Sequence, residues 1–500
     1  MPMPVMPTPR VLSAALGLAV LLGGCQAAEA EALVCWPVPP PPPLDRGQPV
    51  LWVSLAAHLG QAPLLLQGAG APLELVDAQG VRVRSERLQL RWQAQPLPAP
   101  VEIRRTVVGP LASFERAEQV ALAWRRQGVA AEVAHPGDWE VWAPAGVAPP
   151  PGHPVRVVQQ RLLQRLVPQL STPAGWRSLA GPIQISAAKG LRLEGGVFAG
   201  PFRLQADAYG SWTLVEQVPL ERYLQGVVPH EIGAASPAAA LAAQAVLART
   251  WALRNQHRFA VDGYHLCADT QCQVYGDPRQ AGEAVRASIR ATSGRVLVAE
   301  GQPIHAVYHA SNGGVSADED EAWPLPELSY LEPALDLSSS APQGLRLPIT
   351  STAELSRLLA LRAGVVGAAH PLFRWQRQLS QAALRQGLGA RAAGLGAPLK
   401  PVVLERGPSG RVVKLAIQGP GGRVVLERDA IRRTYRQLPS TLFVLSPAGA
   451  GAWRVQGGGF GHGAGLSQAG AIELAGRGWS LEQILKRYYP GARLVPIKDL

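Results

Sequence analysis

The segment 238–252 constrains the fold more than any other part of this chain. It reads AAALAAQAVLARTWA, and its alanines and leucines give it a high helix propensity. Apolar residues lie on almost every side, so the sequence predicts a buried helix around which other elements pack. Ser236 followed by Pro237 predicts its start, because serine favours the N-cap and proline the first helical position. Three polar side chains must then find partners in the interior: Gln244, Arg249 and Thr250.

The composition is that of a folded protein with many turns. Of 500 residues, 47% are apolar and 17% charged, while glycine and proline number 53 and 46. Strand-like runs at 50–55 and 183–215 accompany the helix, so the sequence predicts an α+β fold of many short β-strands around a buried Ala-rich helix. The net charge of +12 suits an anionic partner such as the cell wall. We expect no nucleic-acid partner, because zinc-finger spacing, basic heptads and aromatic RNA-binding signatures are absent.

Residues 1–24 have the pattern of a lipoprotein-type signal peptide. Arg10 precedes an apolar run, 11–22, that is too short to span a bilayer comfortably. Leu22-Gly23-Gly24-Cys25 resembles the bacterial lipobox, in which Cys25 carries a lipid anchor to a membrane. The alternative is a plain signal peptide cut near Ala28 or Ala30. Both interpretations predict an exported protein of the cell envelope or periplasm.

The chain then divides into successive regions. Residues 25–49 are Pro-rich and predict an extended tether. An N-terminal β region follows at 50–103, and a linker at 149–152 precedes the largest predicted domain, residues 180–500.

Residues 104–148 predict a small αβ insertion. A helical pattern at 114–124 is followed by strand-like segments at 129–133 and 139–142. With Gly109, Ser113 and Phe114 at its opening, this unit resembles a SPOR repeat, a family that binds glycan strands stripped of peptides. A generic αβ insertion is the alternative.

A carboxylate, Glu231, precedes the buried helix on a predicted turn, where it can face a cleft. The run Tyr223–Glu231 and the segment Ala243–Thr250 resemble the SpoIID/LytB family, whose usual form is Tyr-Leu-x-Gly-Val-Val-Pro-x-Glu leading into Ala-Gln-Ala-Val-x-Ala-Arg-Thr. Four later blocks match in order, so the resemblance covers roughly residues 180–500: Tyr308–Gly314, Ser440–Phe443, Gly459–Ala471 and Ile484–Gly491.

The resemblance implies a lytic transglycosylase acting on peptidoglycan glycan strands, in which Glu231 matches the catalytic residue. One acid protonates the leaving oxygen and then accepts a proton from the C6 hydroxyl of the sugar, which closes a 1,6-anhydro ring. No cofactor is required. Alternatively, Glu231 caps the following helix or pairs with Arg249. Some relatives enhance a cell-wall amidase, so a glycan-binding amidase enhancer without catalytic activity is the second functional hypothesis.

The glycine-rich block around His462 requires close backbone approach, either at a ligand wall or where two segments cross. Its polar groups either contact the sugar or brace Glu231, and the same alternatives hold for the block at 308–314. Together with Gln244, Arg249 and Thr250, the predicted substrate-binding or site-supporting residues are His309, Ser311, Asn312, His462, Ser467 and Gln468.

Cys267 and Cys272 match a segment that binds zinc in some family members. With His265 or His257 they supply three ligands for a structural zinc ion. Gln271 stands where a histidine often precedes the second cysteine. The alternative is a Cys267–Cys272 disulfide, which suits an exported protein.

Overall fold

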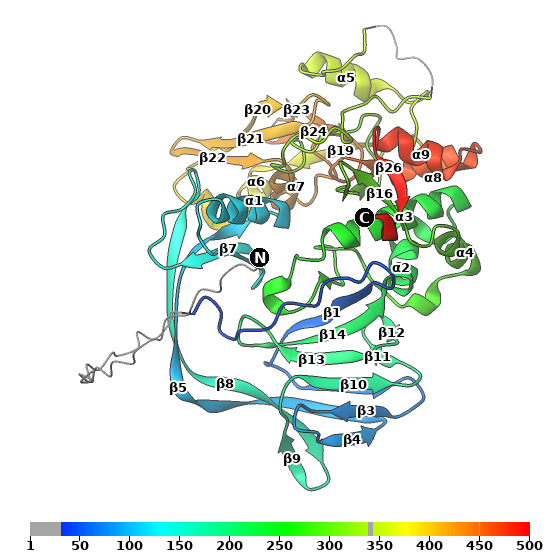
Figure 1. Cartoon of the computed structure of the whole chain (residues 1–500). Helices are drawn as coiled ribbons and strands as arrows, with labels where there is room; N and C mark the ends of the chain where they lie inside the picture. The colour runs from blue at the N-terminus through cyan, green and yellow to red at the C-terminus, as the bar shows by residue number, and fades with distance from the viewer. Residues whose placement is uncertain (1–31, 339–343, 450) are drawn as a thin grey trace, which may run out of the picture.

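The computed structural model describes residues 32–338, 344–449 and 451–500. The signal peptide at 1–24 and the predicted lipidation residue Cys25 lie outside the described residues. The fold is a mixed α+β arrangement with several sheets, as predicted (Figure 1). Its α-helices are α1 (Phe114–Arg125), α2 (Leu220–Val228), α3 (Ala238–Arg254), α4 (Glu283–Ala291), α5 (Thr352–Ala360), α6 (Gln381–Leu388), α7 (Asp429–Thr434), α8 (Gln468–Gly476) and α9 (Leu481–Tyr488). Shorter turns are the π-helical η1 (Pro229–Gly233) and the 3₁₀ turns η2 (Ala260–Asp262), η3 (Pro278–Gln280), η4 (Gly389–Ala392) and η5 (Ile497–Asp499).

One sheet joins the N-terminal β region to strands more than a hundred residues later. Val50 pairs with Pro219 and Leu73 with Ala187, so residues 50–103 and the start of the 180–500 region share a hydrogen-bonded sheet. In spatial order its strands are β15 (Leu266–Cys267), β1 (Val50–Leu59), β14 (Trp212–Pro219), β13 (Phe202–Ala206), β10 (Ile183–Ala187), β3 (Leu73–Val76) and β4 (Arg82–Ser85).

A second sheet carries a long two-stranded ribbon. The expected boundary at 103/104 falls inside one strand, β5, which with β8 runs from the lower sheets up to α1 and β7 (Figure 1). The strands are β12 (Gly196–Phe198), β11 (Leu191–Leu193), β2 (Leu64–Gly68), β5 (Arg87–Leu111), β7 (Trp139–Pro144) and β6 (Glu132–Ala134), with β8 (Val155–Thr172) on β5 and β9 (Gly175–Ser178) on β8.

We call residues 112–148 the N-terminal module. Its helix α1 begins after Ser113, whose hydroxyl accepts a hydrogen bond from the Arg116 N–H. Phe114, Trp124 and Trp139 are buried in its core. The order helix, strand, strand is the one expected for 104–148, while its assignment to the SPOR repeats stays a prediction.

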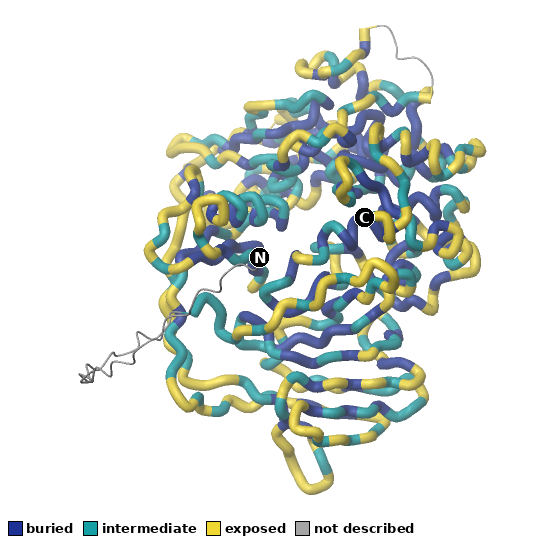
Figure 2. Tube along the Cα trace, viewed as in Figure 1, coloured by how far each residue is buried: buried dark blue, intermediate teal, exposed yellow. Residues whose placement is uncertain are grey.

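Helix α3 lies at the centre of the main core. Residues 240–253 are buried without a break, and Figure 2 shows the buried chain concentrated between the sheets and the outer helices. The expected cap at Ser236 is wrong. The helix starts at Ala238 with Pro237 as N-cap, and the Ser236 hydroxyl donates instead to the carbonyl of Ile232 (2.7 Å), which the π-turn η1 brings within reach.

A further lobe, within 345–458, has its own hydrophobic core. It contains two small antiparallel sheets: β19 (Arg374–Leu379), β24 (Trp453–Gly458) and β23 (Phe443–Pro447), and β20 (Lys400–Arg406), β21 (Val412–Gly419) and β22 (Gly422–Glu427). The remaining strands are β16 (Arg295–Ala299) with β17 (Gln302–Pro303) and β26 (Arg493–Pro496), and β18 (Tyr308–His309) with β25 (Leu466–Ser467).

The Pro-rich segment differs from a free tether over its described part. The Cys35 N–H donates to the Ala208 carbonyl (2.8 Å), and the Pro42 carbonyl lies 2.9 Å from the His265 ring. Extended backbone lacks internal hydrogen bonds, so its polar groups can be satisfied by the body against which it lies. Within the described ranges, no helix is long and apolar enough to cross a membrane.

Candidate functional site

Glu231 lies in the π-turn η1 between α2 and α3. Its Oε1 accepts a hydrogen bond from the Val274 N–H (3.0 Å), and its carboxylate accepts a second one from the Tyr308 hydroxyl. Burial raises the pKa of Glu231, while these two hydrogen bonds act in the opposite direction and the net shift is upward. The two hydrogen bonds therefore stabilise the charged form of this carboxyl group, while its buried surroundings favour the neutral form.

A directional series of hydrogen bonds leads to this carboxylate. The Tyr223 hydroxyl donates to Gln273 Oε1 (3.1 Å), and Gln273 Nε2 donates to the Tyr308 oxygen (3.0 Å). The Tyr308 hydroxyl is then free to donate its own proton to Glu231. Gln273 is 2% exposed. Its buried amide accepts from Tyr223 and donates to Tyr308, and these two roles set the direction of the series.

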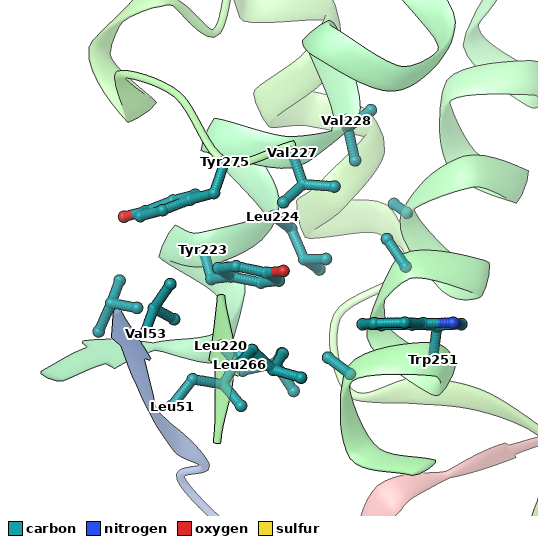
Figure 3. Close-up of a cluster of buried hydrophobic side chains, with 14 of the residues drawn as sticks. Leu51, Val53, Leu220, Tyr223, Leu224, Val227, Val228, Trp251, Leu266 and Tyr275 are labelled. Atoms are coloured by element: carbon teal, nitrogen blue, oxygen red, sulfur yellow. The ribbon is translucent and has the colours of Figure 1, made fainter. Parts of the chain in front are cut away.

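Two close approaches bring the 273–276 segment to Glu231. A side chain on Gly226 would meet the Tyr275 ring at 2.4 Å, and one on Gly276 would meet the His230 ring at 2.5 Å. The Gly276 N–H donates to the Gly226 carbonyl (3.0 Å). Figure 3 shows the Tyr275 ring above the Tyr223 ring, to the left of Val227. The centroids of the two rings lie 5.0 Å apart. Both glycines are needed because a Cβ at either position would collide with an aromatic ring of the other segment.

Two cavities share Glu231 in their lining. One, of about 560 Å³, is here called the arginine-lined cavity. The other, of about 540 Å³, is called the apolar cavity. The arginine-lined cavity is bordered by Phe114, Glu115, Glu231, Trp251, Arg258, Thr270, Gln271, Cys272, Gln273, Val274, Val307, Tyr308, Trp323, Asp429, Arg432, Arg433, Arg436, Leu438, Phe460 and His462. The apolar cavity is bordered by Glu231, Ile232, Ala310, Gly367, Ala369, His370, Gln468, Ala469, Ile472 and Glu473.

Glu231 differs from the other carboxylates of these cavities in its partners. Each of the others forms an ion pair with an arginine: Glu115 with Arg258, Asp429 with Arg432 (2.8 Å) and with Arg433 (3.0 Å), and Glu473 with Arg477. Burial opposes the charge of Asp429, but the two arginines outweigh it and lower the pKa of this group. Glu231 accepts hydrogen bonds from neutral donors instead, and its pKa is raised, so it is the carboxyl group of this set that we regard as the candidate for proton transfer.

The polar residues of α3 support the core rather than line either cavity. Arg249 is fully buried and forms a bidentate ion pair with Glu221 (2.7 Å for both contacts), so the alternative that Glu231 pairs with Arg249 is wrong. Thr250 accepts from the Leu297 N–H (3.0 Å). Gln244 Oε1 accepts from Gln468 Nε2 (3.2 Å), and Gln468 borders the apolar cavity.

The blocks around His309 and His462 cross each other. The Phe460 N–H donates to the Ser311 carbonyl (2.7 Å), and a side chain on Gly461 would meet His309 Cβ at 2.6 Å. The close crossing of segments expected for the glycines is observed here, and Phe460 and His462 of the same block also border the arginine-lined cavity. His309 and Ser467 are buried within this crossing, and Ser467 caps α8 through the Gly470 N–H.

Two further members of the crossing differ in their relation to the site. Asn312 Nδ2 donates to Asp336 (2.7 Å), away from both cavities. His462 borders the arginine-lined cavity, and its Nε2 lies 2.8 Å from the Tyr308 carbonyl. Burial, reinforced by Arg432, lowers the pKa of His462 to about 4. A neutral His462 that accepts from the Ala464 N–H at Nδ1 must donate from Nε2, so it holds the backbone of Tyr308.

The predicted zinc ligands are not arranged around a metal. Cys267 and Cys272 form a disulfide. Both ring nitrogens of His265 are engaged, by the Trp52 N–H and the Pro42 carbonyl (2.9 Å each), while His257 pairs with Glu118. Across the residues described, no group of three or more candidate side chains is placed to hold a metal ion. The residues at 265–272 therefore do not fit a zinc site in this form.

Comparison with known proteins identifies two matched regions. The family model described as Stage II sporulation protein, SpoIID, matches residues 208–298, and a domain of unknown function, DUF8618, matches 317–465. Over residues 208–298 the chain therefore matches the SpoIID family. The Stage II sporulation protein D of Bacillus subtilis (strain 168) is 26% identical over 303 residues, covering 56% of this chain and 75% of that protein. Its counterpart in Bacillus amyloliquefaciens is 28% identical over 300 residues, covering 55% and 74%. The Amidase enhancer of Bacillus subtilis (strain 168) is 26% identical over 300 residues, covering 54% of this chain but 40% of that protein.

The arginine-lined cavity combines four parts of the chain. The SpoIID match supplies Glu231 and the 270–274 segment, and the DUF8618 match supplies α7 and Trp323. The N-terminal module supplies Phe114 and Glu115, and the stretch between the two matches supplies Val307 and Tyr308. Sequence reasoning missed Gln273, Val274 and Tyr308 as partners of Glu231. Tyr308 begins a family block and Gln273 follows Cys272, so proximity to a motif is the one signal that could have drawn attention to them.

Proposed function

We propose that this protein cleaves peptidoglycan glycan strands by a lytic transglycosylase mechanism that leaves 1,6-anhydro-muramic acid ends. The observation that carries the proposal is Glu231, a carboxyl group of raised pKa that borders two cavities at once. A strand that occupies both cavities would place a glycosidic bond at this group. The family match and the named relatives give the cell-wall context.

Glu231 would serve the reaction twice. As the neutral acid it gives its proton to the glycosidic oxygen while the bond from that oxygen to C1 breaks. As the carboxylate it takes the proton of the C6 hydroxyl while O6 bonds to C1, so that the enzyme returns to its starting state. Burial favours the first form, and the donors Val274 and Tyr308 stabilise the second. The attacking group belongs to the substrate, so a second carboxylate is not needed.

The proposal includes a preference for peptide-stripped glycan, export, and attachment through a lipid on Cys25. Palmitate labelling of the wild type and of Cys25→Ser in cells tests the anchor. A membrane-bound, unlabelled protein would contradict it.

The test of the activity uses purified peptidoglycan, with and without amidase pretreatment. We expect 1,6-anhydro products from the wild type and none from Glu231→Gln, while both proteins still sediment with glycan. Glu327→Gln, an exposed carboxylate outside both cavities, is the matched control and should cleave like the wild type. Identical product profiles for wild type and Glu231→Gln would refute the catalytic assignment.

The second candidate function is that of an amidase enhancer without its own cleavage activity. The observation in its favour is the relative named Amidase enhancer, at 26% identity. It predicts faster peptide release by a cell-wall amidase when this protein is added, to the same degree with Glu231→Gln. The same digests, scored for stem peptides as well as anhydro sugars, separate the two functions.

A further inference from the structure

The segment Gln271–Val274 forms one long side of the arginine-lined cavity. At one end, the Val274 N–H donates to Glu231 (3.0 Å). At the other end, Gln271 Oε1 accepts from the Trp139 ring nitrogen (3.1 Å), and the Gln271 carbonyl accepts from Arg258 (3.0 Å). Three residue steps of chain span at most about 10 Å, and this segment is shorter than extended chain because residues 271 and 272 lie in a turn and a bend. The Cα atoms of Gln271, which contacts the N-terminal module, and of Val274, which holds Glu231, therefore lie at most about 10 Å apart, a length comparable to that of a disaccharide.

Helix α1 of the N-terminal module is fixed at that end of the cavity, because its first turn contributes Phe114 and Glu115 to the lining. Glu115 forms an ion pair with the buried Arg258, whose guanidinium also lies over the Phe114 ring at 4.4 Å. One turn further on, Glu118 pairs with His257 (2.6 Å). These contacts join α1 to the SpoIID side of the cavity.

The same helix also reaches the opposite side. Arg116 Nη1 lies 3.3 Å from Glu427 Oε2 at the end of β22, within the DUF8618 match. Helix α1 is thus tied both to the SpoIID side and to the DUF8618 side of the arginine-lined cavity. The apolar cavity, which shares Glu231 with the arginine-lined cavity, has no residue of the N-terminal module among those described in its lining.

We infer that α1 closes the arginine-lined cavity, so that only a short end of a glycan strand fits between Glu231 and Phe114. The inference rests on the proposed function and adds where along the strand the enzyme cuts. The remainder of the strand continues through the apolar cavity. Cleavage then removes short fragments stepwise from one end of the strand, rather than cutting within it.

The fragment lengths at early reaction times test this inference. Amidase-treated glycan strands are digested with the full exported chain, and products are sized by mass spectrometry. We expect one short fragment class from the first time point, with slow shortening of the long strands. A broad distribution of lengths at early times would overturn the inference and leave the proposed function intact. An absence of anhydro products from the wild type would instead reject the proposed function, and the inference with it.

Charge reversal tests whether α1 is the wall. Arg116→Glu and Glu427→Arg each replace the ion pair by a repulsion, and we expect several-fold more long fragments from each variant. The double variant restores the pair with opposite polarity and should return to short fragments. Arg126→Glu, exposed at the end of α1, is the control with the same charge change and should behave like the wild type. If all variants remain folded by circular dichroism and give short fragments alike, α1 is not the wall.

Discussion

Replacing Gly226 by alanine should disturb the site without touching Glu231. The new Cβ would lie 2.4 Å from Tyr275 Cε2 and 2.5 Å from the Gly276 carbonyl oxygen. Carbon atoms normally pack at about 3.5–4.0 Å, so the ring must move by about 1 Å. It has little room, since Tyr275 is 4% exposed and its hydroxyl donates to Glu216 (2.8 Å).

Overpacking of this kind costs about 1–3 kcal/mol of unfolding free energy. The displaced segment also carries Val274, whose N–H holds Glu231. A misplacement of about 1 Å can slow a reaction about 100-fold, so we expect Gly226→Ala to lose most anhydro-product formation while remaining folded below a lowered melting temperature.

The control for this substitution is Gly476→Ala in α8. A Cβ at Gly476 would have no heavy atom within 4 Å, and its φ is compatible with alanine. We expect this variant to gain about 0.4–1 kcal/mol of stability and to keep wild-type activity. If Gly226→Ala keeps both the cleavage rate and the melting temperature of the wild type, close packing at Gly226 does not position Glu231.

Three further predictions concern the groups around the carboxylate. Because burial raises the pKa of Glu231, its ionisation destabilises the folded state as the pH rises above the ordinary pKa of 4.5. Glu231→Gln should therefore have a higher melting temperature than the wild type well above pH 4.5. Below this pH the two proteins should have the same melting temperature. Tyr308→Phe removes a donor to the charged form, so the alkaline limit of the pH–rate profile should move upward, and an unchanged profile would contradict the assigned hydrogen bond. Loss of the disulfide in Cys267→Ser/Cys272→Ser opens a loop of sequence separation 5, which should lower the unfolding free energy by about 2 kcal/mol through loop entropy and reduce cleavage. Stoichiometric zinc with free thiols in the wild type would refute the disulfide assignment.

Features written in local sequence could be predicted, because periodicity and capping act over a few residues. The α1 and α3 patterns and the strand at 139–142 correspond to elements of the structure. The error at Ser236 has a local cause, since the π-turn supplied the hydroxyl with a nearer acceptor in the Ile232 carbonyl. Competition between two short-range partners for one side chain cannot be decided from residue preference alone.

The partners of Glu231 could not be read from the sequence, because they come from distant segments. The Val274 bond spans 43 residues, and the His462 contact that holds the Tyr308 backbone spans 154. Such pairs depend on how several elements pack, and a hydrophobic pattern constrains only which face of each element is buried. Cys267 and Cys272 predicted a cross-link or a metal at this place, but not that the residues immediately after them would contact the carboxyl group.

The family motifs locate Glu231, but they do not explain its proton affinity. A buried carboxyl group without donors would remain neutral and serve poorly as a base, whereas one paired with arginine, as Asp429 is, would remain charged and serve poorly as an acid. Neutral donors give intermediate stabilisation of the charge, because they offer hydrogen bonds without a full positive charge. The amide of Gln273 makes this arrangement specific: by donating to the Tyr308 oxygen, it leaves the hydroxyl proton of Tyr308 available for Glu231. A single carboxyl group can therefore be suited to both proton transfers by partners that lie outside the motif that contains it.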